Sequence, residues 1–295
     1  MAIKLAFLGV IIIWSTTPLG LKWSGEEVGF LFGVTTRMML GVVISTLVML
    51  ALRHTLSLHR QAIRAYIASG IGIYLAMLFG YWSASYIPSG WIAVIWGTSP
   101  VFAGVLGSIV LGEKAFTLHR IIGVIAGLTG LAIIFLQGAS ISENTLLGVV
   151  LALIGVLSQV STAVWIKQIK ADLPGIVMTT GGLAVSVPLF IITWWIFDGA
   201  LPEVIPTRVA WSIIYLALMG SVLGFSLYYY LLNHVEASKV SLITLITPVT
   251  ALLLGHWLNN EALTLWVFIG TALILSGLVS YQFGGKLFAN NVDTS

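Results

Sequence analysis

The stretch Trp96–Ala103, with the sequence WGTSPVFA, recurs 148 residues later as Thr244–Ala251, with the sequence TLITPVTA. Each copy holds a proline directly after a hydroxyl side chain, at Pro100 and at Pro248. Proline removes a backbone donor and clashes with the carbonyl four residues earlier, so both copies predict a kinked or broken helix. Helix breaks at matching places in two halves of an apolar chain are typical of secondary transporters.

Composition places the whole chain in a membrane. Only 8% of the residues are charged, against about 25% in ordinary soluble domains, and 59% are hydrophobic with a mean hydropathy of +1.06. The pI of 9.2 does not indicate nucleic-acid binding, because the basic residues lie in short loops between apolar runs. The chain has no cysteine, which excludes disulfides and thiolate metal sites. The expected partners are a lipid bilayer and a small-molecule substrate, with no nucleic acid, no cofactor and no metal, in a monomer or a homodimer.

Hydropathy predicts ten membrane spans, since about 20 apolar residues cross a bilayer core of about 30 Å. The predicted ranges are 3–22, 29–52, 65–85, 88–111, 118–136, 146–166, 174–196, 208–232, 238–257 and 264–283. The predicted fold is an all-α membrane protein with two five-helix repeats, residues 1–137 and 145–284, followed by a tail at 285–295. Thr117 and Thr264 are predicted to cap the fifth and tenth helices.

The basic residues predict the orientation. With the N-terminus inside, ten of the 13 lysines and arginines lie on the inner face, Lys22 and Arg208 lie outside, and Arg37 lies within the second span. The positive-inside rule then puts both termini in the cytoplasm. Five spans per copy is an odd number, so the second repeat is expected to be inverted relative to the first, with a central cavity between them. The expected location of the protein is the plasma membrane, which is the inner membrane in a bacterium.

The chain resembles a known family at a set of short motifs. These are Trp14–Ser15 and Arg37; Ser89–Gly90, Ser99–Pro100 and Gly112–Lys114; Gly220–Gly224, Tyr228–Tyr230, Ala237–Ser238, Thr247–Pro248 and Glu261. Together they resemble the EamA-type repeat of the drug/metabolite transporter superfamily. The resemblance implies ten helices in inverted repeats, a central cavity, and export of small metabolites or amino acids.

The acidic residues narrow the substrate class. All ten lie in predicted loops or at span ends, whereas small multidrug antiporters of the wider superfamily use a membrane-embedded glutamate. A buried carboxylate is the simplest counter-ion for a cationic drug. We therefore expect neutral or zwitterionic substrates, most readily amino acids including aromatic ones. We also expect substrate transport that is not coupled to protons through a carboxylate deep in the membrane. A multidrug or organic-cation exporter is the alternative.

A channel and a membrane-embedded enzyme are the rivals from other classes. An intramembrane protease needs a pair of mid-span aspartates or a mid-span serine–histidine pair, and the sequence has neither. Its five histidines have no further ligands at metal-binding spacing. We therefore expect a protein that is not an enzyme.

The candidate substrate-binding residues are polar or aromatic side chains within the predicted spans, near the two proline breaks. They are Trp14, Ser15, Thr17, Arg37, Tyr81, Trp82, Trp96, Ser99, Gln159, Thr162, Tyr228, Tyr229, Thr244 and Thr247. Single hydroxyls in a bilayer often only bond a nearby carbonyl, but the set suits a cavity for an amphipathic metabolite.

Five residues have special predicted roles. Arg37 has two interpretations: it snorkels or bonds carbonyls of a neighbouring helix, or it clamps a substrate carboxylate. Pro100 and Pro248 are predicted hinges. Glu261 and its counterpart Glu113 are expected to end helices at the interface, and the alternative is a gating ion pair with a nearby lysine such as Lys114.

Overall fold

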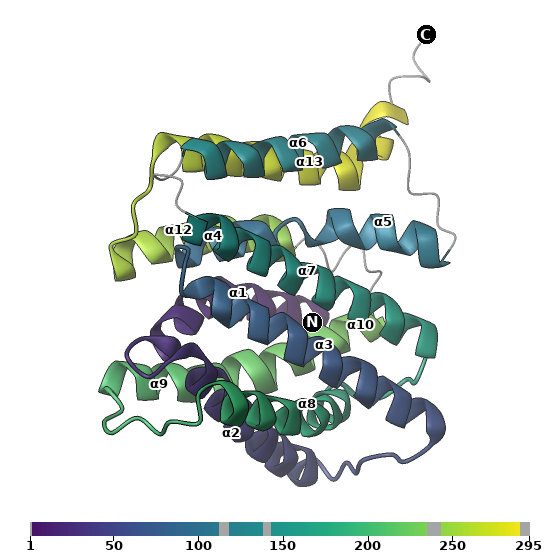
Figure 1. Ribbon diagram of the computed structural model, residues 1–295. Helices are drawn as coiled ribbons and strands as arrows, with labels where there is room; N and C mark the ends of the chain where they lie inside the picture. The colour runs from purple at the N-terminus through teal and green to yellow at the C-terminus, as the bar shows by residue number, and fades with distance from the viewer. Residues whose placement is uncertain (1, 112–117, 138–142, 235–242, 290–295) are drawn as a thin grey trace.

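The computed structural model describes residues 2–111, 118–137, 143–234 and 243–289, and every regular element in these ranges is a helix (Figure 1). The elements are α1 (Ala2–Gly25), α2 (Phe30–Ala51), α3 (Arg60–Ala84), α4 (Ser89–Trp96), α5 (Ser99–Leu111), α6 (Leu118–Gln137), α7 (Glu143–Ile169), α8 (Gly175–Phe197), α9 (Thr207–Tyr215), η1 (Leu216–Gly224), α10 (Phe225–His234), α12 (Ile243–Asn259) and α13 (Leu265–Ala289). The predicted all-α class is confirmed for this part of the chain.

Seven helical segments of the described chain are long and apolar enough to cross a membrane. They are Ala2–Gly25, Phe30–Ala51, Arg60–Ala84, Ser89–Gly107, Glu143–Ile169, Gly175–Phe197 and Thr207–Leu231. Shorter apolar helices occupy Ile121–Ile134 and Leu265–Ser280. Each of the ten predicted ranges holds a described helix, and α13 continues to Ala289, beyond its predicted end. The molecule is a multi-pass membrane protein.

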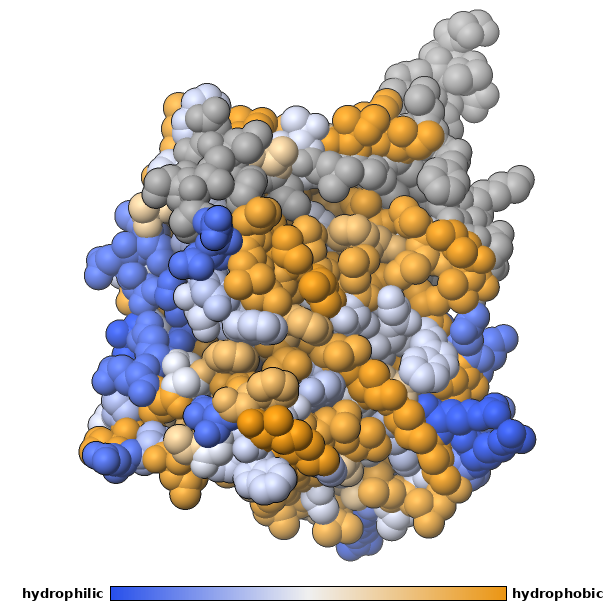
Figure 2. Space-filling view, viewed as in Figure 1, coloured by the Kyte–Doolittle hydropathy of each residue, from blue (hydrophilic) through white to orange (hydrophobic). Residues whose placement is uncertain are grey.

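The surface carries a broad apolar belt. In Figure 2 orange atoms cover most of the visible face, and blue groups gather at its left and right margins, where many of the helices of Figure 1 end. Large apolar side chains point outward along these helices, such as Leu47 (63% exposed) and Trp195 (75% exposed). Such an extended apolar surface suits lipid, because soluble monomers rarely expose large contiguous apolar patches.

The helices α6 and α13 form a closely packed pair along one side of the bundle (Figure 1). Glycines let their backbones approach: a Cβ added at Gly130 would lie 2.5 Å from the carbonyl oxygen of Gly270. Small residues are typical of helix contacts in membranes, where close van der Waals packing drives association.

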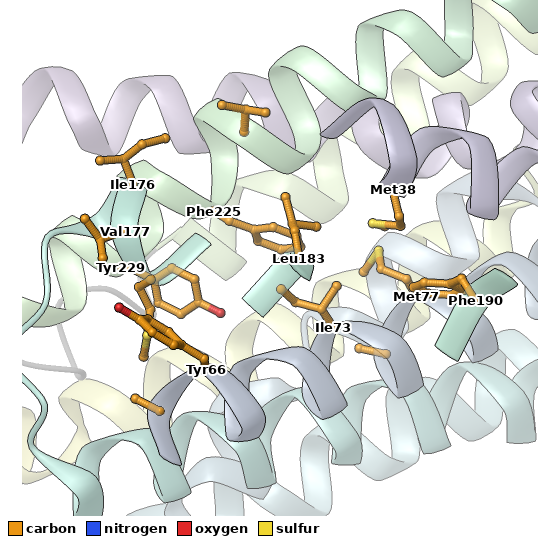
Figure 3. Close-up of a cluster of buried hydrophobic side chains, with 14 of the residues drawn as sticks. Met38, Tyr66, Ile73, Met77, Ile176, Val177, Leu183, Phe190, Phe225 and Tyr229 are labelled. Atoms are coloured by element: carbon orange, nitrogen blue, oxygen red, sulfur yellow. The ribbon is translucent and has the colours of Figure 1, made fainter. Parts of the chain in front are cut away.

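The main apolar core lies where α3 meets α8 and α10 (Figure 3). It includes Met38, Tyr66, Leu183 and Phe225, which come from both halves of the chain. A second core joins α4 and α7 to α12 and α13. Both cores are therefore built from both halves, and the two halves interleave.

The two proline breaks differ in local structure. The fourth predicted span is divided at Gly97 and Thr98 into α4 and α5, so Pro100 is the second residue of α5, where its missing amide costs least. The Ser99 hydroxyl donates to the Trp96 carbonyl, which the proline deprives of its helical donor. Pro248 instead lies inside the continuous helix α12.

The eighth predicted span contains an element that hydropathy does not predict. Its middle, Leu216–Gly224, is wound as the π-helix η1 between α9 and α10. π-helical segments are rare and occur frequently at functional sites. The predicted cap at Thr264 is confirmed, because its Oγ1 accepts from the Val267 amide at 3.3 Å; Thr117 lies outside the described residues.

Candidate functional site

The helix α12 crosses the interruption between α4 and α5. A Cβ added at Gly97 would lie 3.1 Å from Cγ of Pro248, so the two breaks predicted from the duplication lie against each other. One turn further along α12, Leu252 packs so closely on Gly90 that an added Cβ would lie 2.6 Å from its side chain. We call this contact between Gly97 and Pro248, with the side chains around it, the crossing site.

Trp96 closes one side of the crossing site. Its ring edge fits between α3 and α7, where a Cβ at Gly80 would lie 3.1 Å away and one at Gly155 only 2.8 Å away. The indole Nε1 donates to Oε1 of Gln159 at 2.6 Å. Trp96 and Gln159, two predicted site residues, are thus brought together, and both remain partly accessible.

Hydroxyl groups form the other side, between α1 and α12. Ser15 Oγ donates to the Ile11 carbonyl at 2.7 Å and lies 2.5 Å from Oγ1 of Thr250. Oγ1 of Thr250 also lies 3.1 Å from the carbonyl oxygen of Thr247, and the Thr247 side chain is buried. Thr250 was not among the predicted residues, although it lies near the end of the repeated stretch.

The aromatic candidates of α10 lie next to α1 and α3. The rings of Trp14 and Tyr228 are 5.1 Å apart, and those of Tyr228 and Tyr229 are 5.7 Å apart. Tyr229 points into the main apolar core (Figure 3), where its hydroxyl lies 2.8 Å from Oγ of Ser69. In this conformation the contacts of Tyr229 are therefore those of a core residue.

Arg37 is only 1% exposed and does not snorkel to the surface. Its Nε donates to Oγ of Ser221 at 3.0 Å, and its Nη1 lies 3.5 Å from the hydroxyl of Tyr81. Ser24 of α1 also donates to that hydroxyl, at 3.1 Å. The guanidinium therefore ties α2 to η1 and α3 through neutral groups, and it forms no ion pair with the described acids.

The remaining candidates lie apart from the crossing site. Trp82 stacks on Phe30, with ring centres 6.0 Å apart, and Thr17 donates to the Ile13 carbonyl at 2.7 Å. Thr162 packs directly on Gly72 of α3. The side chain of Thr244 lies outside the described residues.

Glu261 corrects one expectation. It does not end a helix, because α12 stops at Asn259 and Glu261 lies in the loop before α13. Its carboxylate instead accepts hydrogen bonds from the first two amides of α4, those of Ser89 and Gly90. Its cationic partner is Lys22, 3.8 Å away. Glu113 and Lys114 lie outside the described residues.

Both halves of the chain match one family. Residues 1–136 and 146–281 each correspond to the EamA-like transporter family. The chain belongs to this family. The expected resemblance is thereby confirmed, and membership of the EamA-like family indicates a membrane transporter.

Several bacterial proteins are similar to the EamA-like chain. The uncharacterized transporter YoaV of Bacillus subtilis is 25% identical over 286 residues, which cover 95% of this chain and 97% of that one. The uncharacterized inner membrane transporter YedA of Escherichia coli K12 is 29% identical and covers 68% of this chain and 64% of its own length. A probable amino-acid metabolite efflux pump of Escherichia coli K12 is 24% identical, with 67% and 69% covered.

A solved crystal structure shares the fold. Its TM-score is 0.72 at 16% sequence identity, and the alignment covers 99% of both chains. The fold described above therefore also occurs in a second chain of low sequence identity.

Proposed function

We propose that this protein exports small neutral or zwitterionic metabolites, above all amino acids including aromatic ones, by alternating access. In this scheme ten helices form two inverted five-helix repeats, residues 1–137 and 145–284, around a central cavity. Both termini and the tail at 285–295 lie in the cytoplasm. Family membership supports transport, and the bias of basic residues supports this orientation.

The crossing site carries the proposal. Inverted-repeat transporters hold substrate near the midplane, where interrupted helices from the two repeats meet. Here Gly97, at the interruption between α4 and α5 in the first half, lies against Pro248, which is inside the continuous helix α12 of the second half. We infer that the substrate passes between α1, α4, α7 and α12 at this point.

The chemistry of the crossing site supports the substrate class. Its polar groups are the hydroxyls of Ser15, Ser99 and Thr250 and the amide of Gln159, beside the indole of Trp96. Neutral hydrogen-bonding groups and an aromatic wall suit an amphipathic molecule with a polar end. A relative described as a probable amino-acid metabolite efflux pump agrees with this class.

Coupling is proposed to occur without a deep carboxylate. The acidic residues of the sequence lie in loops or near span ends, and a proton relay inside the membrane normally uses Asp, Glu or His. Facilitated diffusion or substrate exchange follows as the mode of transport.

Uptake into liposomes tests the proposed function. Purified protein is reconstituted, and entry of labelled phenylalanine, leucine and a lipophilic organic cation is followed with and without a proton gradient. We expect saturable amino-acid uptake that does not need the gradient and is accelerated by amino acid inside the vesicles. Gradient-driven uptake of the cation alone would establish the multidrug alternative, and uptake that never saturates would indicate a channel.

A further inference from the structure

Four helix ends meet at one end of the bundle, which we call the Glu261 end. They are the end of α1, the start of α4, the start of α9 and the end of α12. The first two belong to the first half of the chain, and the last two belong to the second. Polar contacts between these ends therefore connect the two proposed repeats.

Glu261 caps α4 from a distant part of the chain. Its Oε1 accepts from the Ser89 amide at 2.9 Å, and its Oε2 accepts from the Gly90 amide at 3.1 Å. The first amides of a helix have no partner within the helix, and a carboxylate there also meets the positive end of the helix dipole. Pro88, which precedes α4, provides no side-chain cap. The start of α4 thus depends on a residue of the second half.

The same carboxylate is held from α1 and α12. Lys22 lies 3.8 Å from its Oε1, and Asn259 donates to the same oxygen at 3.1 Å. The side chain of Glu261 is only 7% exposed, so these contacts are shielded from water. Charged hydrogen bonds in such surroundings are stronger than those at an exposed surface.

Asn259 extends the contacts to α9. Its Oδ1 accepts from Nε1 of Trp23 and from Nη2 of Arg208, both at 2.9 Å. The Arg208 guanidinium lies over the Trp23 ring at 4.3 Å and 3.6 Å from the carboxylate of Glu26. Two of these contacts, Asn259 with Glu261 and Asn259 with Arg208, lie within the second half, and the others join one half of the chain to the other.

We propose that Glu261 is the latch of a gate at this end: its carboxylate holds the gate closed, and transport requires it to leave the α4 amides. This inference rests on the proposed alternating-access function. A cap within one repeat would persist when the repeats move, whereas a cap between repeats has to break whenever this end opens. Under the proposed topology the Glu261 end is external.

Two variants test whether the carboxylate of Glu261 itself holds the gate closed. Glu261→Gln keeps the shape of the side chain but removes its charge and turns one acceptor into a donor that faces an amide donor. Gly255→Ala leaves Glu261 intact, but the added methyl group would collide with the carboxylate and displace it. The matched controls are Glu203→Gln, at an exposed acid in the loop before α9, and Gly127→Ala, where an added Cβ meets nothing within 4 Å.

Opening is measured with a cysteine reporter, because the chain has no native cysteine. Ala93→Cys places a thiol one turn below Gly90 at a position that is 4% exposed. A membrane-impermeant maleimide is applied to vesicles of both orientations, so that labelling from the Glu261 end is measured whatever the topology. Loss of a charged hydrogen bond should raise the labelling rate about tenfold in Glu261→Gln and in Gly255→Ala. The two controls should label like the parent.

The outcomes distinguish this inference from the proposed function. Labelling that stays at the parent rate in Glu261→Gln, or that rises equally in Glu203→Gln, contradicts the latch. Aggregation of both Glu261→Gln and Gly255→Ala would also overturn it, because Glu261 would then be a permanent structural cap. The labelling needs no substrate, so failure of the parent protein to transport any amino acid would refute the proposed function and leave this result standing.

Discussion

At the scale of single residues, the role of Trp96 in transport can be tested by a substitution that keeps an aromatic ring in its place. Trp96→Phe keeps an aromatic ring between Gly80 and Gly155 but removes the hydrogen bond to Gln159. A neutral hydrogen bond is worth about 1 kcal/mol. We therefore expect substrate flux to fall about fivefold while the melting temperature in detergent stays near that of the parent. Trp165→Phe, at an exposed position of α7, is the control. Equal substrate flux in Trp96→Phe and the parent would contradict a role for Trp96 in the substrate pathway.

Arg37 is expected to act mainly on stability. Arg37→Gln removes a buried charged hydrogen bond to Ser221 and the contact with Tyr81, and such bonds contribute about 1.5–3 kcal/mol. The free energy of unfolding in detergent should fall by about 2 kcal/mol. Arg53→Gln, at the exposed end of α2, should change it by less than about 0.5 kcal/mol. Normal stability together with lost amino-acid affinity in Arg37→Gln would favour the substrate-clamp interpretation.

Local rules predicted some residue roles and not others. The roles of Thr264 and Ser99 depend on residues close to them in sequence. Thr264 caps α13 through the Val267 amide, and Ser99 donates to the Trp96 carbonyl. The α4 amides that donate to Glu261 are more than 170 positions away from it, so no local pattern identifies them. The spacing of the two glutamates indicated only that Glu261 belongs to the duplicated pattern.

At the scale of elements, the prolines are predicted to control bending of the helices on opposite sides of the crossing site. Pro100→Ala and Pro248→Ala each restore one amide donor and should stiffen the helix around it. Both variants should slow transport, with a cavity cysteine becoming accessible from opposite faces in the two. Pro188→Ala, inside α8, has no counterpart in the other half and serves as the control. Normal transport in both variants, or a bias toward the same face, would contradict the hinge role.

Hydropathy predicted where helices lie, because a lipid crossing demands about 20 apolar residues. The separation of α4 from α5 was predicted by Pro100 rather than by hydropathy, and the π-helix η1 was not predicted at all. The partners of these two elements come from other helices: Pro248 lies against Gly97, and Ser221 of η1 bonds Arg37. A sequence window that covers one helix at a time does not contain this information.

At the scale of the whole molecule, the duplication predicted two five-helix repeats but not their interleaving. α2 packs on α8 and η1, α3 packs on α7 and α8, and α1 packs on α12. The two repeats therefore share their cores, and movement of one relative to the other requires these contacts to slide or separate.

The orientation of the chain in the membrane is directly testable. Glu143→Cys, at the start of α7, should react with an impermeant reagent added to intact cells, and Arg60→Cys, at the start of α3, should react only after permeabilisation. This outcome follows from the concentration of basic residues on the inner face. The opposite pattern would place both termini outside.

The most direct measurement of the central claim is two-sided labelling of Ser99→Cys, at the crossing site, in reconstituted vesicles. Alternating access predicts that an impermeant reagent reaches this thiol from each face of the membrane in separate experiments, and that a transported amino acid slows labelling from both faces. A thiol that reacts from only one face, or that substrate never protects, would contradict a pathway through the crossing of α12 with the α4–α5 interruption.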